Sequence, residues 1–204
     1  MKSIKWKILI ITCIVCLSPI LLGIALWDVL PEQIAIHFDI HNQPDSFTSK
    51  GFAVFGLPAF MALIQCLCGV ITDINAKKHG ETKKFEAAAK WIIPFVTIAL
   101  YIVTLGYSLD WNIDIRMAAC CIVGIEFIVL GNYLPKLNYV KHYKLSEEKA
   151  RKFNRFGGFL TFIMGVLFLI SIFLPPVASI ICLFLLIPYV IVLLVYMFVV
   201  IKKK

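Results

Sequence analysis

Six apolar runs, each about as long as a bilayer is thick, constrain the fold of this chain more than any other feature. They cover residues 8–27, 52–71, 91–109, 117–134, 156–174 and 177–201. A helix needs about 20 predominantly apolar residues to cross the hydrocarbon core of a membrane. Because lipid cannot satisfy backbone hydrogen bonds, such runs must be helical. The sequence therefore predicts an all-α integral membrane protein with six transmembrane helices.

Composition agrees with this fold class and argues against several functions. Of the 204 residues, 61% are hydrophobic and 16% are charged, which is typical of an integral membrane protein. All seven cysteines lie in the apolar runs, so neither a disulfide framework nor a zinc ribbon is indicated. The sequence contains no nucleic-acid-binding module, catalytic triad or phosphate-binding loop. We therefore expect neither an enzyme nor a bound cofactor.

Basic residues are concentrated on one side of the predicted six-helix arrangement. Of the 20 Lys and Arg residues, only Lys50 and Arg116 fall on the other side. By the positive-inside rule, both termini then lie in the cytoplasm and residues 31–51 face outward. The net charge of +8 also favours contact with anionic membrane lipid.

The predicted outer loop, residues 31–51, carries the densest polar chemistry in the chain. Apolar and polar residues alternate over residues 34–41, which predicts a short, half-buried strand. Because side chains alternate between the two faces of a strand, the polar face would present His37, Asp39 and His41. These three side chains are candidates for binding a ligand.

Turn-forming residues follow the predicted strand. Asn42 tolerates a left-handed backbone and Pro44 fixes its own φ, so the chain should turn back as a small extracytoplasmic hairpin. We expect Asp45 and Lys50 to hold this hairpin to the ends of the helices. Acidic residues outnumber basic ones on this side, which either attracts a cation or cationic peptide or simply follows from keeping basic residues inside.

A metal site is permitted by the same side chains but is the weaker interpretation. His37, Asp39 and His41 are of zinc-ligating types. The two histidines are four positions apart, about 13 Å in an extended strand, so only neighbouring His–Asp pairs could share an ion without a bend. Recognition of a ligand without metal is the favoured role for this face.

Glu126 is the most informative polar residue inside a predicted span. An ionisable group at mid-membrane costs about 3 kcal/mol or more unless it is neutral or paired, so Glu126 should face other helices. Gln65 is a candidate hydrogen-bond partner. Glu126 and Asn132, which lies closer to the cytoplasmic boundary, are candidates for a ligand or ion site. The alternative for Glu126 is a protonated packing residue.

Two stretches of the chain resemble the SdpI family of bacterial immunity proteins. The resemblance in the first half rests on Leu30-Pro31, Ile36-His37-Phe38-Asp39 and Asp45-Ser46-Phe47 with Lys50. Asn42 stands where the family usually has glycine. In the second half it rests on residues 130–136, Asn138-Tyr139 and residues 155–158. Residues 140–144 depart from the family, which usually continues there with Gly-x-Arg-Thr-Pro-Trp-Thr.

The resemblance implies both an organisation and a function. It implies an N-terminal module at 1–73, a cytoplasmic loop at 74–90, and a C-terminal module at 91–204 that contains a cytoplasmic loop at 135–155. It implies a bacterial plasma-membrane protein that protects its cell from a secreted peptide toxin. The candidate toxin-binding residues are then His37, Asp39, His41, Asp45, Lys50, Glu126 and Asn132.

Signalling through a cytoplasmic repressor-type partner is also implied, although the departure at 140–144 weakens that part of the expectation. Two other functions stay open. One is a small ion-coupled transporter, oligomeric and with Glu126 as its titrating group. The other is a membrane sensor whose basic 135–155 loop binds a cytosolic partner.

Overall fold

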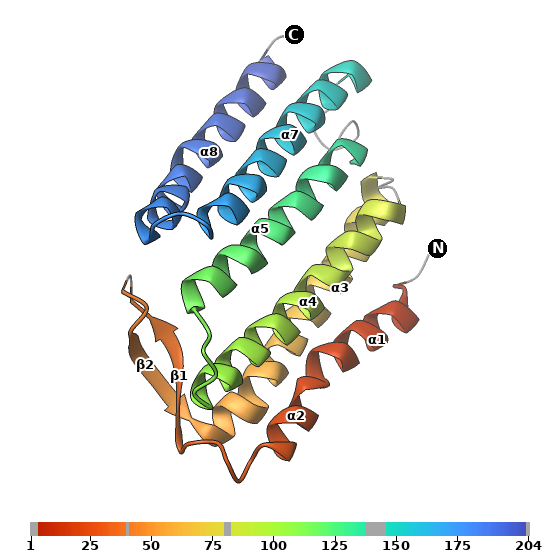
Figure 1. The fold of residues 1–204 in the computed structure, drawn as a ribbon. Helices are drawn as coiled ribbons and strands as arrows, with labels where there is room; N and C mark the ends of the chain where they lie inside the picture. The colour runs from red at the N-terminus through yellow and green to blue at the C-terminus, as the bar shows by residue number, and fades with distance from the viewer. Residues whose placement is uncertain (1–3, 40, 80–82, 138–145, 203–204) are drawn as a thin grey trace. The chain divides into compact units, whose positions relative to one another are not determined.

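The computed structural model describes residues 4–39, 41–79, 83–137 and 146–202. Its helices are α1 (Trp6–Leu17), α2 (Pro19–Ala25), α3 (Leu57–His79), α4 (Lys83–Ser108), α5 (Ile115–Tyr133), α7 (Glu147–Ser171) and α8 (Pro176–Lys202) (Figure 1). Strands β1 (Gln33–Phe38) and β2 (Pro44–Ser49) form a two-stranded antiparallel sheet. A π-helical turn, η1, spans Phe52–Gly56, and a 3₁₀ turn, η2, spans Leu134–Lys136.

Six segments in the described ranges are long and apolar enough to cross a membrane. They are Trp6–Ala25, Phe52–Ala76, Phe85–Ser108, Ile115–Lys136, Glu147–Ser171 and Pro176–Val200. The first combines α1 and α2, which are separated at Ser18, just before Pro19. These segments confirm the predicted all-α membrane fold, with boundaries shifted by a few residues.

Helix extends into both segments for which we expected cytoplasmic loops. In the first, residues 74–90, α3 continues to His79 and α4 begins at Lys83. In the second, residues 135–155, α7 begins at Glu147 and continues without a break through the fifth predicted apolar run, to Ser171. The Ser146 hydroxyl caps α7 by accepting a hydrogen bond from the Lys149 backbone N–H at 3.4 Å. The other part of this loop, residues 138–145, lies outside the described residues.

The first compact unit contains the chain up to Asp73 together with Lys90–Ala118. Its buried apolar cluster joins the hairpin, η1 and α4, and consists of Leu30, Ile34, Ala53, Val54, Tyr101 and Leu105. At the end of β1, Phe38 packs edge-on against Tyr107, with ring centroids 4.6 Å apart. The hairpin is therefore docked on the helices through one apolar face. The compact units do not follow the predicted division into two modules, since Lys90–Ala118 belongs to the first unit and the predicted C-terminal module begins at residue 91. The two family modules therefore stay a prediction.

The second compact unit contains Ile74–Ala89 and the chain from Ala119 onward. Here α5 and α7 approach each other backbone to backbone. A Cβ atom at Gly131 would lie 2.5 Å from the Phe162 backbone nitrogen, and one at Gly165 would lie 2.7 Å from the Gly124 carbonyl. Small residues at such crossings are common between membrane helices, because van der Waals packing drives helix association in lipid.

Candidate functional site

The hairpin differs from the predicted strand in length and in pattern. β1 ends at Phe38 rather than at His41. The strict alternation is wrong at two positions, because Ala35 is buried beside Ile34 while Ile36 is exposed. The pairing with β2 is irregular on both sides of His37, and such a bulge redirects side chains from that point on, which accounts for the exposure of Ile36 but not for the burial of Ala35.

Asp39 belongs to the turn and not to the polar face of β1. Its Oδ1 accepts hydrogen bonds from the backbone N–H groups of His41 and Gln43, both at 2.8 Å. These bonds, first that from Gln43 and then that from His41, hold the pKa of the Asp39 carboxyl below its usual range. Asn42 has φ 64°, which confirms the predicted left-handed turn. Its side-chain oxygen accepts from the Arg116 backbone N–H at the start of α5, at 3.3 Å.

His37 and Asp45 form the polar pair of the hairpin. His37 Nδ1 and Asp45 Oδ1 are 2.5 Å apart, and the side chains are 69% and 47% exposed. Phe47 lies two residues beyond Asp45 on β2, opposite Ala35, and is 54% exposed. This exposed face, which consists of His37, Asp45 and Phe47, therefore combines an imidazole, a carboxylate and an aromatic ring.

Lys50 anchors the hairpin, as predicted, whereas Asp45 does not. The Lys50 side chain is only 10% exposed, and its Nζ lies 2.8 Å from Glu32 Oε1. The same ammonium donates to the carbonyls of Trp27 and Leu30, both at 3.4 Å, and lies 4.9 Å from the centre of the Trp27 ring. Asp45 instead bonds across the strands to His37. Lys50 therefore serves as a clamp at the base of the hairpin.

The three metal-ligand candidates do not gather at one point. In the described part of the chain, no group of three His, Cys, Asp or Glu side chains is placed to hold a metal ion. The reason is local: Asp39 faces into the turn, while His37 is paired with Asp45. The His37–Asp39–His41 set is therefore a poor fit for a metal ion.

Glu126 and Asn132 lie on α5, in the second compact unit. Glu126 is half-buried, and its Oε1 is a buried atom without a hydrogen-bond partner among the described residues. Gln65, its suggested partner, donates instead to the Thr12 hydroxyl and to the Lys90 carbonyl. Asn132 is exposed near the end of the helix. Glu126 therefore remains a candidate for a functional group inside the membrane.

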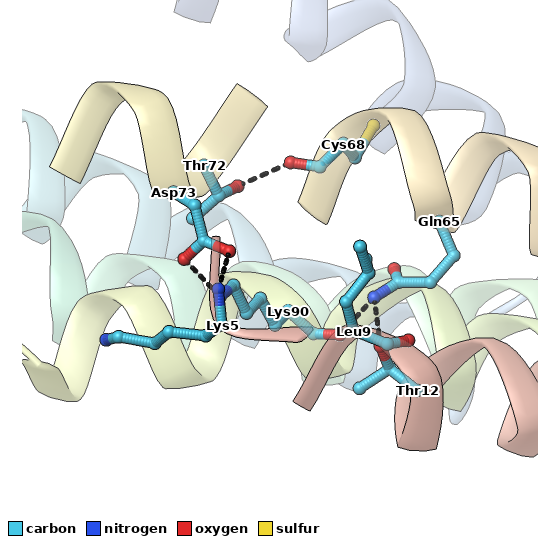
Figure 2. Close-up of polar contacts among 8 residues, drawn as sticks. All are labelled: Lys5, Leu9, Thr12, Gln65, Cys68, Thr72, Asp73 and Lys90. Carbon is cyan, nitrogen blue, oxygen red and sulfur yellow. Dashed lines mark hydrogen bonds and ion pairs between the residues drawn. The ribbon is translucent and has the colours of Figure 1, made fainter. Parts of the chain in front are cut away.

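Sequence reasoning missed a buried polar cluster in the first compact unit, shown in Figure 2. Lys90 Nζ lies 2.5 Å from Asp73 Oδ1, with 1% and 6% of the two side chains exposed. Asp73 Oδ2 also accepts from the Lys5 backbone N–H at 3.0 Å. The cluster thereby joins α3, α4 and the segment before α1.

The sequence did contain signals for this cluster, although they were weak. Asp73 is an acidic residue near the end of a span, and Lys90 is a lysine just before the next one. The positive-inside rule alone accounts for a lysine at position 90, so the sequence gives no reason to expect an acidic partner for it. Asp73 and Lys90 both lie outside the predicted apolar runs, in helical turns by which α3 and α4 extend beyond those runs.

Together these features define a multi-pass helical membrane protein whose first two spans are joined by a clamped β-hairpin. Residues 14–62, which include the whole hairpin, match a family described as a domain of unknown function, DUF1648. No curated protein and no solved structure matches the chain.

Proposed function

We propose that this is a bacterial immunity protein of the SdpI type, which protects its cell from a secreted antimicrobial peptide. In this proposal it lies in the plasma membrane with both termini in the cytoplasm. The observation that carries the proposal is the docked hairpin: one face is buried on the helices, while His37, Asp45 and Phe47 are left exposed. The resemblance of this stretch to the family supports the same function.

The chemistry of the exposed face favours a peptide that is both cationic and apolar. Asp45 supplies an anionic group, and Glu32 at the base of the hairpin adds a second exposed carboxylate. Phe47 offers an aromatic surface for an apolar side chain. A binding role needs no reacting group, which is consistent with a protein that is not an enzyme. Contacts with a cytoplasmic repressor-type partner stay part of the proposal only through the resemblance.

The test is survival of a toxin-sensitive Gram-positive strain that expresses the protein, challenged with secreted peptide toxins including one of the sporulation-delaying type. Asp45→Asn and Phe47→Ala should abolish protection at unchanged protein level, because they alter the exposed face. Gln33→Ala is the matched control, since Gln33 is exposed at the start of β1 and pairs with Ser49, at the other end of the hairpin from His37 and Asp45. Full protection by Asp45→Asn and Phe47→Ala would remove the hairpin from the mechanism.

Glu126 favours a second candidate function, that of an ion-coupled carrier. A buried carboxyl oxygen without a partner is suited to bind a proton or a cation. The expected result is ion flux in proteoliposomes that depends on Glu126 and is lost in Glu126→Gln. Absence of flux with the unaltered protein would eliminate this candidate.

A further inference from the structure

We infer that Gln65 replaces the backbone donor that Pro94 removes from α4, and that Gln65 and Tyr101 together lock α3 and α4 to each other. Gln65 belongs to α3 and serves a carbonyl of α4, while Tyr101 belongs to α4 and serves a carbonyl just before α3. Both bonds lie within the first compact unit. The lock is therefore reciprocal.

The first bond compensates for Pro94. In an α-helix the carbonyl of residue i accepts the N–H of residue i+4, so the carbonyl of Lys90 should be served by residue 94. Residue 94 is a proline inside α4 and has no N–H to donate. Gln65 Nε2 donates to the Lys90 carbonyl at 3.0 Å instead. Since lipid offers no hydrogen bonds, a donor from a neighbouring helix is the available replacement.

The second bond joins α4 to the turn before α3. Val54 lies in the π-helical turn η1, where the carbonyl of residue i pairs with the N–H of residue i+5, so Pro58 does not by itself remove the donor of this carbonyl. The Tyr101 hydroxyl donates to the Val54 carbonyl at 3.3 Å. Gly23 of α2 leaves room for this hydroxyl, because a Cβ at Gly23 would collide with it.

The amide of Gln65 is oriented by this arrangement. Its nitrogen is committed to the Lys90 carbonyl and to the Thr12 hydroxyl, at 3.0 and 2.8 Å, so the side chain also ties α1 to the lock. Its Oε1 is left without a partner among the described residues, although Gln65 is 0% exposed. A fully buried glutamine with a spare acceptor is poorly explained by packing alone, and well explained by the need for its two donor hydrogens.

A double-mutant cycle on the full-length protein tests the first bond. Gln65→Leu should lower the midpoint of thermal unfolding in detergent by about 4 °C, because it orphans a buried carbonyl. Pro94→Ala restores an N–H at i+4, so in that background the same substitution should cost less than half as much. Pro188→Ala, at a proline inside α8 in the second unit, is the control background and should leave the effect of Gln65→Leu unchanged.

Tyr101→Phe tests the second bond and removes one oxygen only, so folding should be retained even if Gln65→Leu fails to fold. Its cost should persist in a Pro94→Ala background, in which the cost of Gln65→Leu shrinks. Equal losses for Gln65→Leu with and without Pro94, or no loss from Gln65→Leu or Tyr101→Phe in the unaltered background, would overturn the inference.

Discussion

Two acid–base pairs in the first compact unit place similar chemistry in opposite surroundings. His37 Nδ1 and Asp45 Oδ1 are 2.5 Å apart, with 69% and 47% of their side chains exposed. Lys90 Nζ and Asp73 Oδ1 are also 2.5 Å apart, with 1% and 6% exposed. Distance does not distinguish the pairs, but access to water does.

This difference separates a pair that can change partners from one that cannot. Water screens the exposed pair and can replace either partner, so the pair contributes little to stability and a ligand can compete for its groups. The buried pair has been desolvated already, and removing one partner leaves the other as a buried charge without that counter-charge. We therefore expect substitutions at the buried pair to act on folding and substitutions at the exposed pair to act on recognition.

The largest effect is expected from Lys90→Met. This change leaves the Asp73 carboxylate buried without its cation, which costs about 3–5 kcal/mol of unfolding free energy. The measurement is reversible unfolding in mixed micelles. Combining Lys90→Met with Asp73→Asn should recover most of the loss, because neither charge remains. A loss below about 1 kcal/mol for the single variant would contradict the buried pairing.

The Lys50–Glu32 pair is intermediate between the exposed pair and the buried pair in its access to water. Its ammonium is nearly buried, while its partner Glu32 is exposed. Lys50→Met should cost about 1–3 kcal/mol, since two backbone carbonyls lose a charged donor. Faster hydrogen exchange should appear in β1 and β2 but not in α7. The control is Lys152→Met, which breaks an exposed pair with Glu148 and should cost less than about 0.5 kcal/mol. Equal costs would mean that Lys50 is not a clamp.

The sequence predicted the spans, the hairpin and the anchoring role of Lys50, but it predicted neither the bulge in β1 nor the Asp73–Lys90 pair. Apolar length and turn chemistry are local properties, so the six spans and the positive φ of Asn42 could be predicted. The bulge in β1 lies between Ile34 and Phe38, which pack against α4, and such tertiary contacts are not encoded in the local alternation pattern. The Asp73–Lys90 pair depends on where two helices end, and helix ends are the least certain part of a sequence-based prediction.

Asp45→Asn addresses the exposed pair directly. The amide keeps the size of the side chain and one acceptor but loses the charge, so unfolding free energy should fall by less than about 1 kcal/mol. Protection in the toxin assay should nevertheless be lost if the proposed function is correct. Unfolding and survival are measured on the same variant. A stability loss as large as that of Lys90→Met would place His37–Asp45 with the structural pairs instead.

The smallest effect is expected from acid acting on Asp39. Hydrogen bonds from the Gln43 and His41 amides lower the pKa of this carboxyl in the folded hairpin. The contribution of this carboxyl to the stability of the folded hairpin is therefore complete above the unfolded pKa of about 3.9 and is lost as the pH falls through the lower folded value.

The amide proton chemical shifts of His41 and Gln43, followed by NMR, should not change between neutral pH and about pH 5, and should move only below about pH 3.9. Asp39→Asn keeps an acceptor without a titrating proton, so it should abolish the movement. A midpoint at or above 3.9 would mean that the two amides do not hold the carboxylate. The exposed hairpin would then resemble the buried cluster even less, because its turn would depend on backbone conformation at Asn42 and not on charge.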